Sequence, residues 1–142
     1  MADVVYNKFK AALMSGTYNL SSGGDVIKIA LVTSAYTPDI DVHDFFDDIT
    51  NEVTGTGYTA KGKALVGQTV TQDNTDDEGV FDGNDITWST STITARGAVV
   101  YQSKTLDNSS ALICYFDFGS DYSSNNGNFT IQWAAEGIIN IG

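Results

Sequence analysis

The side chains that usually perform catalysis or bind metals are scarce in this chain. Its 142 residues contain one His, one Cys and seven basic residues, and only one of the seven is an arginine, Arg96. A nucleophile with its base, a zinc site and an anion clamp all draw on these residue types. His43 would have to act as the sole base from a loop. We therefore predict that the chain is not an enzyme.

The acidic run 73–79 is the nearest approach to a metal site. Calcium prefers several carboxylate and carbonyl oxygens that converge from one loop. Asp73, Thr75 and Asp77 stand at alternate positions, as in an EF-hand loop, but Glu78 occupies the place where the sharp turn needs glycine. The pattern fails, so we predict a solvated hairpin turn with no metal and no cofactor.

The aromatic residues allow two interpretations. Trp88, Trp133 and the seven tyrosines could form a stacking platform for sugars. However, Trp88 follows Ile86 and Trp133 follows Ile131 at a spacing of two residues, which places each Trp on the apolar face of a strand. This spacing favours core packing.

The overall charge limits the partners. The chain has 18 acidic residues and a net charge of −11, and its basic residues are scattered, so we expect no nucleic-acid partner. The acidity serves either solubility and repulsion between copies or attraction to a basic face or to cations. No stretch approaches the roughly 20 apolar residues of a membrane span. Residues 1–9 lack the apolar core of a secretory signal, so we expect synthesis in a cytoplasm.

One amphipathic helix is predicted, over residues 4–14. Its apolar residues recur at helical spacing, Asp3 can cap its start, and Gly16 can close its end. The apolar face either packs on a sheet of the same chain or docks on a neighbouring subunit. The residues that define this face are Val5, Phe9, Ala12 and Leu13.

Most of the remaining sequence is predicted to form β-strands. Residues 26–33 are β-branched and apolar on both faces, which is typical of a central strand covered on two sides. Residues 63–71 form a second strand, in which Gly67 marks a bulge. Further short strands are predicted at 80–82, 86–89, 92–102, 112–118, 128–133 and 138–141.

Strict alternation assigns the faces of two of these strands. In the first, we expect the inward residues to be Ile93, Ala95, Gly97, Val99 and Tyr101. In the second, we expect one face to carry Leu112, Cys114, Phe116 and Phe118. Cys114 has no partner within the chain and is predicted to be a buried thiol.

These elements predict a mainly β protein with an antiparallel β-sandwich or jelly-roll-like fold and one N-terminal α-helix. Seven or eight short strands separated by Gly, Asn, Asp and Ser turns favour this class, and there is no βα rhythm. A chain of 142 residues is long enough for one ordinary core, so we predict a single domain over 1–142. Residues 41–49 mix acids and aromatics and are expected to form a short helical turn inside a long loop.

Several segments of this chain are similar to those of a known group of proteins. The segments that carry the likeness are 28–39, 44–48, 51–58, 80–82, 86–88, 98–101, 115–119 and 129–133. They resemble small proteins encoded among the structural genes of tailed bacteriophages. The likeness spans nearly the whole chain, and it consists of core-strand and turn patterns and not of catalytic motifs.

The resemblance implies a virion component, specifically a capsid decoration or cement protein. Such a protein forms a homotrimer on the outer surface of the phage head and locks neighbouring major capsid protein subunits. A tail-associated or fibre component and a carbohydrate-binding module remain alternatives. We expect the contact surfaces in the N-terminal helix and in the loop 36–58, where two adjacent bulky aromatics cannot easily enter one core. The candidate contact residues are Phe9, Tyr36, Phe45, Phe46 and Tyr58.

Overall fold

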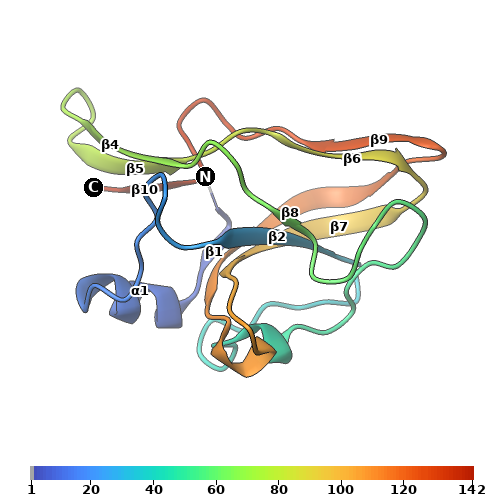
Figure 1. Ribbon diagram of the computed structural model, residues 1–142, viewed down its shortest axis with the longest axis horizontal. Helices are drawn as coiled ribbons and strands as arrows, with labels where there is room; N and C mark the ends of the chain where they lie inside the picture. Colours follow the sequence, from blue (N-terminus) through green and yellow to red (C-terminus); the bar gives the residue numbers. More distant parts are fainter. Residues whose placement is uncertain (1) are drawn as a thin grey trace.

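The computed structural model describes residues 2–142, which form ten strands, one α-helix and two short 3-10 helices. The strands form three antiparallel sheets (Figure 1). The largest is five-stranded, in the order β1-β8-β7-β2-β3. Its strands are β1 (Val4–Val5), β2 (Ile27–Val32), β3 (Lys63–Ala64), β7 (Thr94–Gln102) and β8 (Leu112–Ser123).

The two smaller sheets form a second layer above the five-stranded sheet in the view of Figure 1. One has the order β10-β5-β4, and the other pairs β6 with β9. Their strands are β4 (Thr69–Asp73), β5 (Glu78–Asp82), β6 (Ile86–Ser91), β9 (Gly127–Ile131) and β10 (Ile139–Ile141). The prediction of a mainly antiparallel β protein of the sandwich type with one N-terminal helix is confirmed.

The main hydrophobic core includes residues from both layers and from the helix. Trp88 and Phe129 of the upper layer belong to the same buried cluster as Ile29 and Ile113 of the five-stranded sheet. Burying one such side chain stabilises the fold by roughly 1.5–3 kcal/mol, so this cluster is the chief source of stability.

A second, smaller core lies on the opposite face of the five-stranded sheet. It joins Val32, Val99 and Tyr101 to residues of the long segment 33–58, which contains the 3-10 helix η1 (Phe46–Asp48). Strand β2 therefore has buried side chains on both faces, as the apolar run 26–33 predicted. The predicted helical turn within 41–49 is also confirmed.

The helix is shorter than predicted. Helix α1 covers Asn7–Met14, because Val4 and Val5 are taken into strand β1 and pair with β8. Asp3 does not cap the helix, since its carboxylate accepts the backbone N–H of Asp117 at 2.7 Å. The predicted end is confirmed: Gly16 adopts a φ of 72° and its N–H donates to the carbonyl of Leu13. No helix within residues 2–142 has the length and apolar character needed to cross a membrane.

The strand predicted at 63–71 is divided between two sheets. Strand β3 ends at Ala64 and pairs with β2, whereas β4 begins at Thr69 and pairs with β5. Gly67 lies between them with a φ of 65°, a left-handed conformation that glycine adopts without steric cost. The glycine marks a crossing between layers and not a bulge within one strand.

The residues of the strand 92–102 that were predicted to face inward are all buried, but they do not share one face, because the β7–β8 pairing contains a large bulge. Ala95 lies opposite Tyr122 and Gly97 opposite Asp117, so Arg96 alone faces four residues of β8. The bulge resets the alternation, and Ala98 and Val100 join Ala95 in the main core. The two residues that were expected to share that face, Val99 and Tyr101, pack in the second core.

A smaller irregularity affects the next strand. Val100 pairs with Cys114 and Tyr101 with Leu112, which leaves Ile113 without a residue directly opposite. Cys114 and Phe116 consequently face the main core while Leu112 faces the second one. The prediction that Leu112 shares the face of Cys114 is therefore wrong, although Cys114 itself is fully buried and unpaired, as expected.

Candidate interaction surface

The two adjacent aromatics of the long loop point to opposite sides. Phe46 is buried and stacks on Tyr101 with ring centroids 4.3 Å apart. Phe45, in extended conformation, remains half-buried against the main core, with the ammonium of Lys8 4.7 Å from its ring centroid. Side chains of consecutive residues in an extended chain point to opposite sides, so Phe46 can pack in the second core while Phe45 packs against the main core. Of the two, only Phe45 offers a surface to a partner.

Tyr36 is a structural residue. Its ring is buried, and its hydroxyl lies 2.7 Å from the Tyr6 hydroxyl and 3.1 Å from Nδ1 of His43. The same nitrogen accepts the backbone N–H of Asp39, so it is a lone-pair acceptor and the Tyr36 hydroxyl donates to it. Burial raises the pKa of Tyr36 to about 12. His43 is half-buried, and through these two hydrogen bonds it fastens the loop to the second core.

Tyr58 is also used inside the fold. Its hydroxyl accepts the backbone N–H of Leu31 at 3.0 Å and donates to Oε1 of Glu52 at 2.7 Å. The N–H of Val53 donates to the carbonyl of the same Leu31. The loop thus takes the place of a further strand along this end of β2 and covers its edge.

Phe9 does not form an external contact. It is 1% exposed and its ring centroid lies 5.1 Å from that of Tyr18. Ala12, on the same side of α1, is also buried in the main core. The apolar face of the helix therefore packs within its own chain, which is the first of the two alternatives considered for it.

The candidate contact residues Phe9, Tyr36 and Phe46 are thus corrected to core residues, because each is buried in the single chain. Tyr58 keeps a partly exposed ring, but its hydroxyl is used inside the fold.

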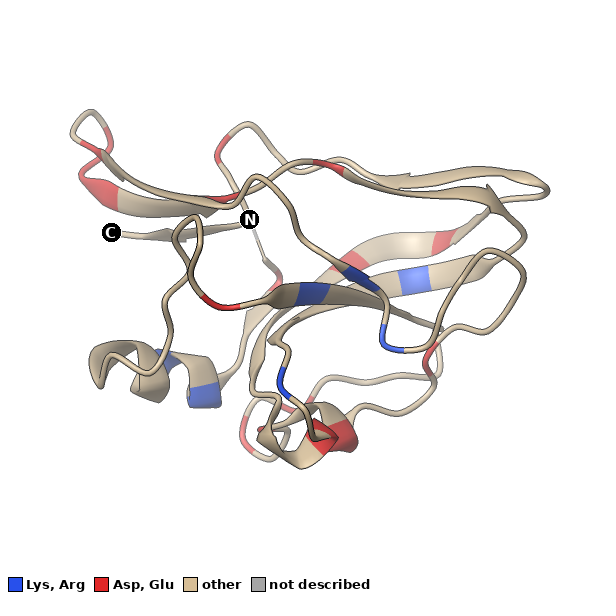
Figure 2. Ribbon diagram, in the orientation of Figure 1, with Lys and Arg blue, Asp and Glu red and all other residues tan. Residues whose placement is uncertain are grey.

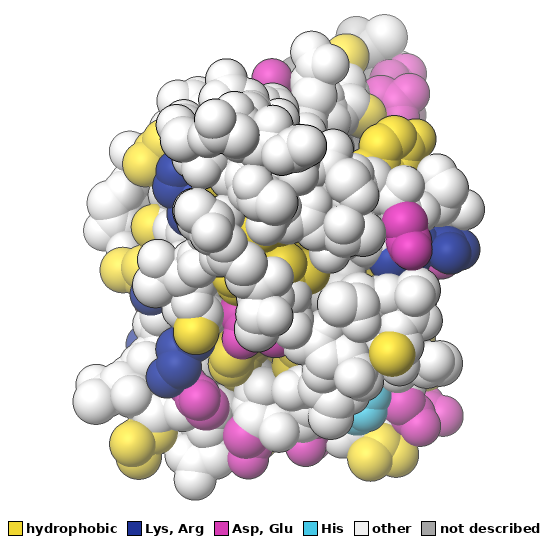
Figure 3. Space-filling view, turned by 90° about the vertical axis from the view of Figure 1, so that its right-hand side faces the viewer, with side chains coloured by type: hydrophobic (Ala, Val, Ile, Leu, Met, Phe, Trp, Pro, Cys, Tyr) yellow, Lys and Arg dark blue, Asp and Glu magenta, His cyan; other side chains and the backbone are white. Residues whose placement is uncertain are grey.

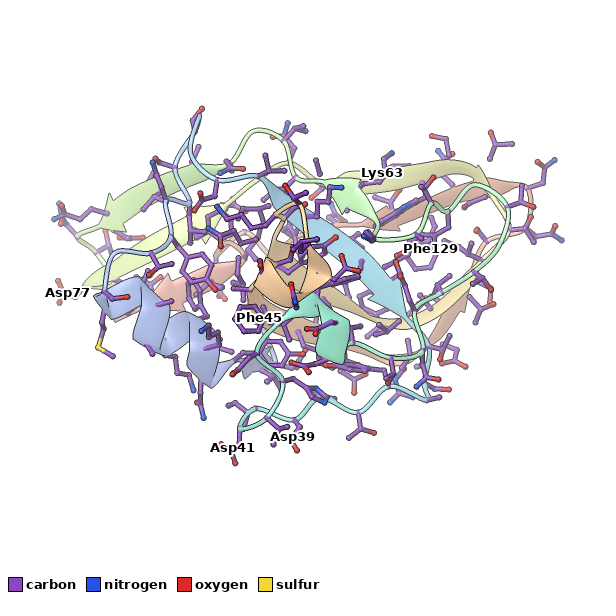
Figure 4. All side chains as sticks on the ribbon, turned by 60° about the horizontal axis from the view of Figure 1, so that its bottom comes forward. Asp39, Asp41, Phe45, Lys63, Asp77 and Phe129 are labelled. Atoms are coloured by element: carbon purple, nitrogen blue, oxygen red, sulfur yellow. The ribbon has the colours of Figure 1, made fainter. Side chains whose placement is uncertain are left out.

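Phe45 is the candidate contact residue that remains. It lies at the wall of a hollow of about 400 Å³ between α1 and the segment 102–111. Lys8 and Lys104 also line this hollow, which makes it locally basic on an acidic protein, although Lys104 Nζ lies 3.9 Å from Oδ1 of Asp25. Figure 4 shows Phe45 beside the helical turn η1.

A second surface, which the sequence reasoning missed, is the open side of the sandwich between β8 and β9. A groove of about 390 Å³ lies there, and Phe118, Tyr122, Phe129 and Ile131 contribute its apolar walls. The Phe118 and Tyr122 rings meet edge to face at 6.2 Å. The bulge of β8 directly precedes Tyr122, whose ring is half-exposed at the margin of the main core.

Five consecutive residues, 128–132, which include most of β9, line one wall of this groove. Among the described residues 2–142, β9 has a single neighbour, β6, so one of its edges has no ladder partner. The sequence signal was present: residues 122–135 carry no charge, in a chain with 18 acidic and seven basic residues. Figure 2 shows β9 in tan, without charged residues, along its whole length, and most of the upper centre of this end of the molecule is white in Figure 3.

The acidic run forms the predicted turn between β4 and β5. Carboxylate oxygens of Asp73, Asp76 and Glu78 lie within 4.8 Å of one another. Asp73 already accepts the backbone N–H groups of Thr75 and Asp76 through Oδ1, which fixes the turn. The position of the Asp73 carboxylate is therefore explained by its hydrogen bonds to the backbone of the turn.

The remaining reactive or stacking side chains are largely enclosed. Trp88 is 2% exposed, as its spacing predicted, and Trp133 is half-buried with its Nε1–H donated to the carbonyl of Asn84. Burial raises the pKa of the Cys114 thiol, so its reactive thiolate is disfavoured.

Fold and surface together define the class: an antiparallel β-sandwich with an acidic surface, one basic aromatic hollow and an uncharged open edge. No protein-family model, no curated protein and no solved structure matches the chain.

Proposed function

We propose that this chain is a non-enzymatic structural protein of a tailed-phage virion that decorates the outer surface of the head and self-associates there. The observation that carries the proposal is the resemblance of its segments to small phage structural proteins. Six of those segments overlap strands, namely β2, β5, β6, β7, β8 and β9, which belong to both layers of the sandwich. The likeness therefore concerns the whole folded body and not one exposed motif.

The charge distribution supports a role in assembly. A net charge of −11 keeps free copies apart, so association is confined to places where the acidity is interrupted. The hollow at Phe45 is one such place, because two lysines flank an accessible aromatic ring. A carboxylate-bearing, partly apolar segment of the major capsid protein fits this chemistry, since it would meet both cations and a ring face.

Binding to phage heads tests the proposal directly. Purified protein is mixed with heads that lack it, and the bound fraction is measured by co-sedimentation. We expect the wild type to saturate the heads and Phe45→Ser to bind at least about tenfold more weakly, since a contact aromatic is lost. Val42→Ser is the matched control, because Val42 lies on the same loop and is exposed. A wild-type protein that stays in the supernatant would refute the head assignment.

The two alternatives give different results in parallel assays. A tail or fibre component would bind isolated tails and not heads. A carbohydrate-binding module would bind immobilised glycans. Because the Trp88 ring is enclosed in the core, a sugar-stacking role would have to use the exposed Tyr122 instead. Tyr122→Ala is therefore the variant that would abolish glycan binding.

A further inference from the structure

The open edge of β9 is unusual for an edge strand in a monomeric protein. Such edges are normally protected by charged residues, proline, a bulge or a covering segment. Strand β2 shows the last device, since the loop that carries Tyr58 covers it. Strand β9 has the sequence Gly-Asn-Phe-Thr-Ile, without charge or proline, and the bulge in its pairing with β6 has its extra residue in β6. Residues 128–132 border the groove. An extended segment could therefore pair with its backbone and place apolar side chains over Phe129 and Tyr122.

Charge indicates which segment can approach. Both strands of this small sheet are neutral, since residues 86–95 and 122–135 contain no charged side chain. Two copies of a protein with a net charge of −11 repel each other over most of their surfaces. At the β9 edge this repulsion is weakest, so a second copy of the same chain can approach most closely there.

The same chain offers a matching edge. Within residues 2–142, strand β4 also has one neighbour, β5, and four of its five residues are exposed. Residues 64–72, which include most of β4, carry no charge, and the apolar Val70 is 53% exposed. The β4–β5 hairpin projects from the body in Figure 1, and in Figure 4 Asp77 at its tip lies at the opposite end of the molecule from Phe129.

We propose that β4 of one copy adds to the β9 edge of the next copy and extends the β6–β9 sheet across the contact. The two edges differ and lie at opposite ends, so the contact is heterologous and builds a ring where the rotation closes. Val70 would then pack over the groove of the neighbouring copy. This inference rests on the self-association in the proposed function and names the surface that produces it.

Added charge tests the contact. Asn128→Asp places a carboxylate on β9, and Thr71→Asp places one on β4; both side chains are exposed in the single chain. We expect each variant to weaken self-association at least about tenfold in sedimentation equilibrium. The added carboxylate would lie in an otherwise uncharged contact and would be repelled by the negative charge of the neighbouring copy. Thr50→Asp is the control, since it adds the same charge to an exposed position of the segment 33–58, away from both edges, and should leave the association constant unchanged.

Cross-linking tests the pairing of edges. Thr69→Cys and Thr130→Cys are prepared separately, mixed and treated with a short bismaleimide; Cys114 stays unreactive because it is buried. We expect a covalent dimer only in the mixture. Cross-linking of Thr130→Cys to itself would indicate a two-fold β9–β9 contact and overturn the proposal.

The outcomes separate this inference from the proposed function. A wild type that associates while Asn128→Asp associates equally well overturns the edge contact and leaves self-association standing. A wild type that remains monomeric at all concentrations overturns the edge contact, and the head-binding assay then decides the function independently.

Discussion

The two outer sides of this molecule differ in whether their strand edges are covered. On the lower side, the segment 33–58 covers one face of the five-stranded sheet and the edge of β2, and it is fastened by Tyr36, His43 and Tyr58. On the upper side, β4 and β9 each have one edge without a strand partner within residues 2–142. One strand edge of this protein is covered by a loop of the same chain, whereas the outer edges of β4 and β9 remain unpaired in the described part of the chain. We therefore infer that the unpaired edges are the contact surfaces.

The largest effect should come from alkaline titration of the closed side. Burial raises the pKa of Tyr36 to about 12, and burial also raises the pKa values of Tyr6 and Tyr101 in the same cluster. Because the folded state holds these phenol protons more tightly than the unfolded state, their stabilising effect is complete below pH ~10 and is lost as the pH rises toward 12.

We therefore expect cooperative unfolding between pH ~10 and ~12, with phenolate absorbance and circular dichroism changing together. If absorbance instead showed these tyrosines titrating near pH 10 while the dichroism stayed native, the closed side would be more open to solvent than described.

A second test compares the neighbouring aromatics. Phe46→Ala should lower the free energy of unfolding by about 3–5 kcal/mol, because it empties a buried site stacked on Tyr101. Phe45→Ala should cost only about 1–2 kcal/mol, since Phe45 is half-buried. Urea denaturation measures both, and equal losses would show that the two rings do not occupy different environments.

The edge cover is tested by Tyr58→Phe. This variant leaves the N–H of Leu31 and the carboxylate of Glu52 without their hydroxyl partner, so we expect a loss of about 1–3 kcal/mol. Hydrogen exchange of the Leu31 amide should accelerate in parallel. Tyr122→Phe, at an exposed tyrosine, is the control; if it were as costly as Tyr58→Phe, the hydroxyl of Tyr58 would have no special role in covering the edge.

The smallest effect is expected on the open side. Asn128→Asp should change the stability of the monomer by no more than about 0.5 kcal/mol, because the side chain is exposed and the edge has no partner in the single chain. Thermal unfolding at dilutions where the protein is monomeric measures this. A large loss would mean that β9 is part of the closed architecture after all.

Local sequence patterns predicted those parts of the fold that depend on local chemistry. The apolar run 26–33 identified a strand buried on both faces, Cys114 was correctly placed in the core, and the acidic run 73–79 formed the expected turn. Each of these depends on residues adjacent in sequence, which a periodicity analysis reads directly.

The errors arose where distant segments decide the structure. Val4 and Val5 look helical in their own neighbourhood but pair with β8, more than 100 residues away. The bulge opposite Arg96 inverts the faces of β7, and nothing in the strand's own alternation shows it.

The candidate contact residues divide in the same way, into those set by the local sequence and those set by distant segments. Phe45 keeps an accessible ring and stays a predicted contact residue. Tyr36 and Phe46 were misassigned because aromatic residues in a loop can be core residues when the loop covers a sheet. Phe9 was misassigned because the apolar face of α1 packs within its own chain. The β9 edge was missed although its neutral run is visible in the sequence. Its meaning depends on knowing that β9 has only one neighbour, which is a property of the topology.

The central claim is that an otherwise self-repelling sandwich associates through defined edges, and its most direct test is the solution mass. Light scattering after gel filtration, over a wide concentration range, should give a closed oligomer, expected to be about three times the 15.2 kDa of one chain. A closed three-membered ring matches a head-to-tail contact. A mass of one chain at every concentration would contradict the claim.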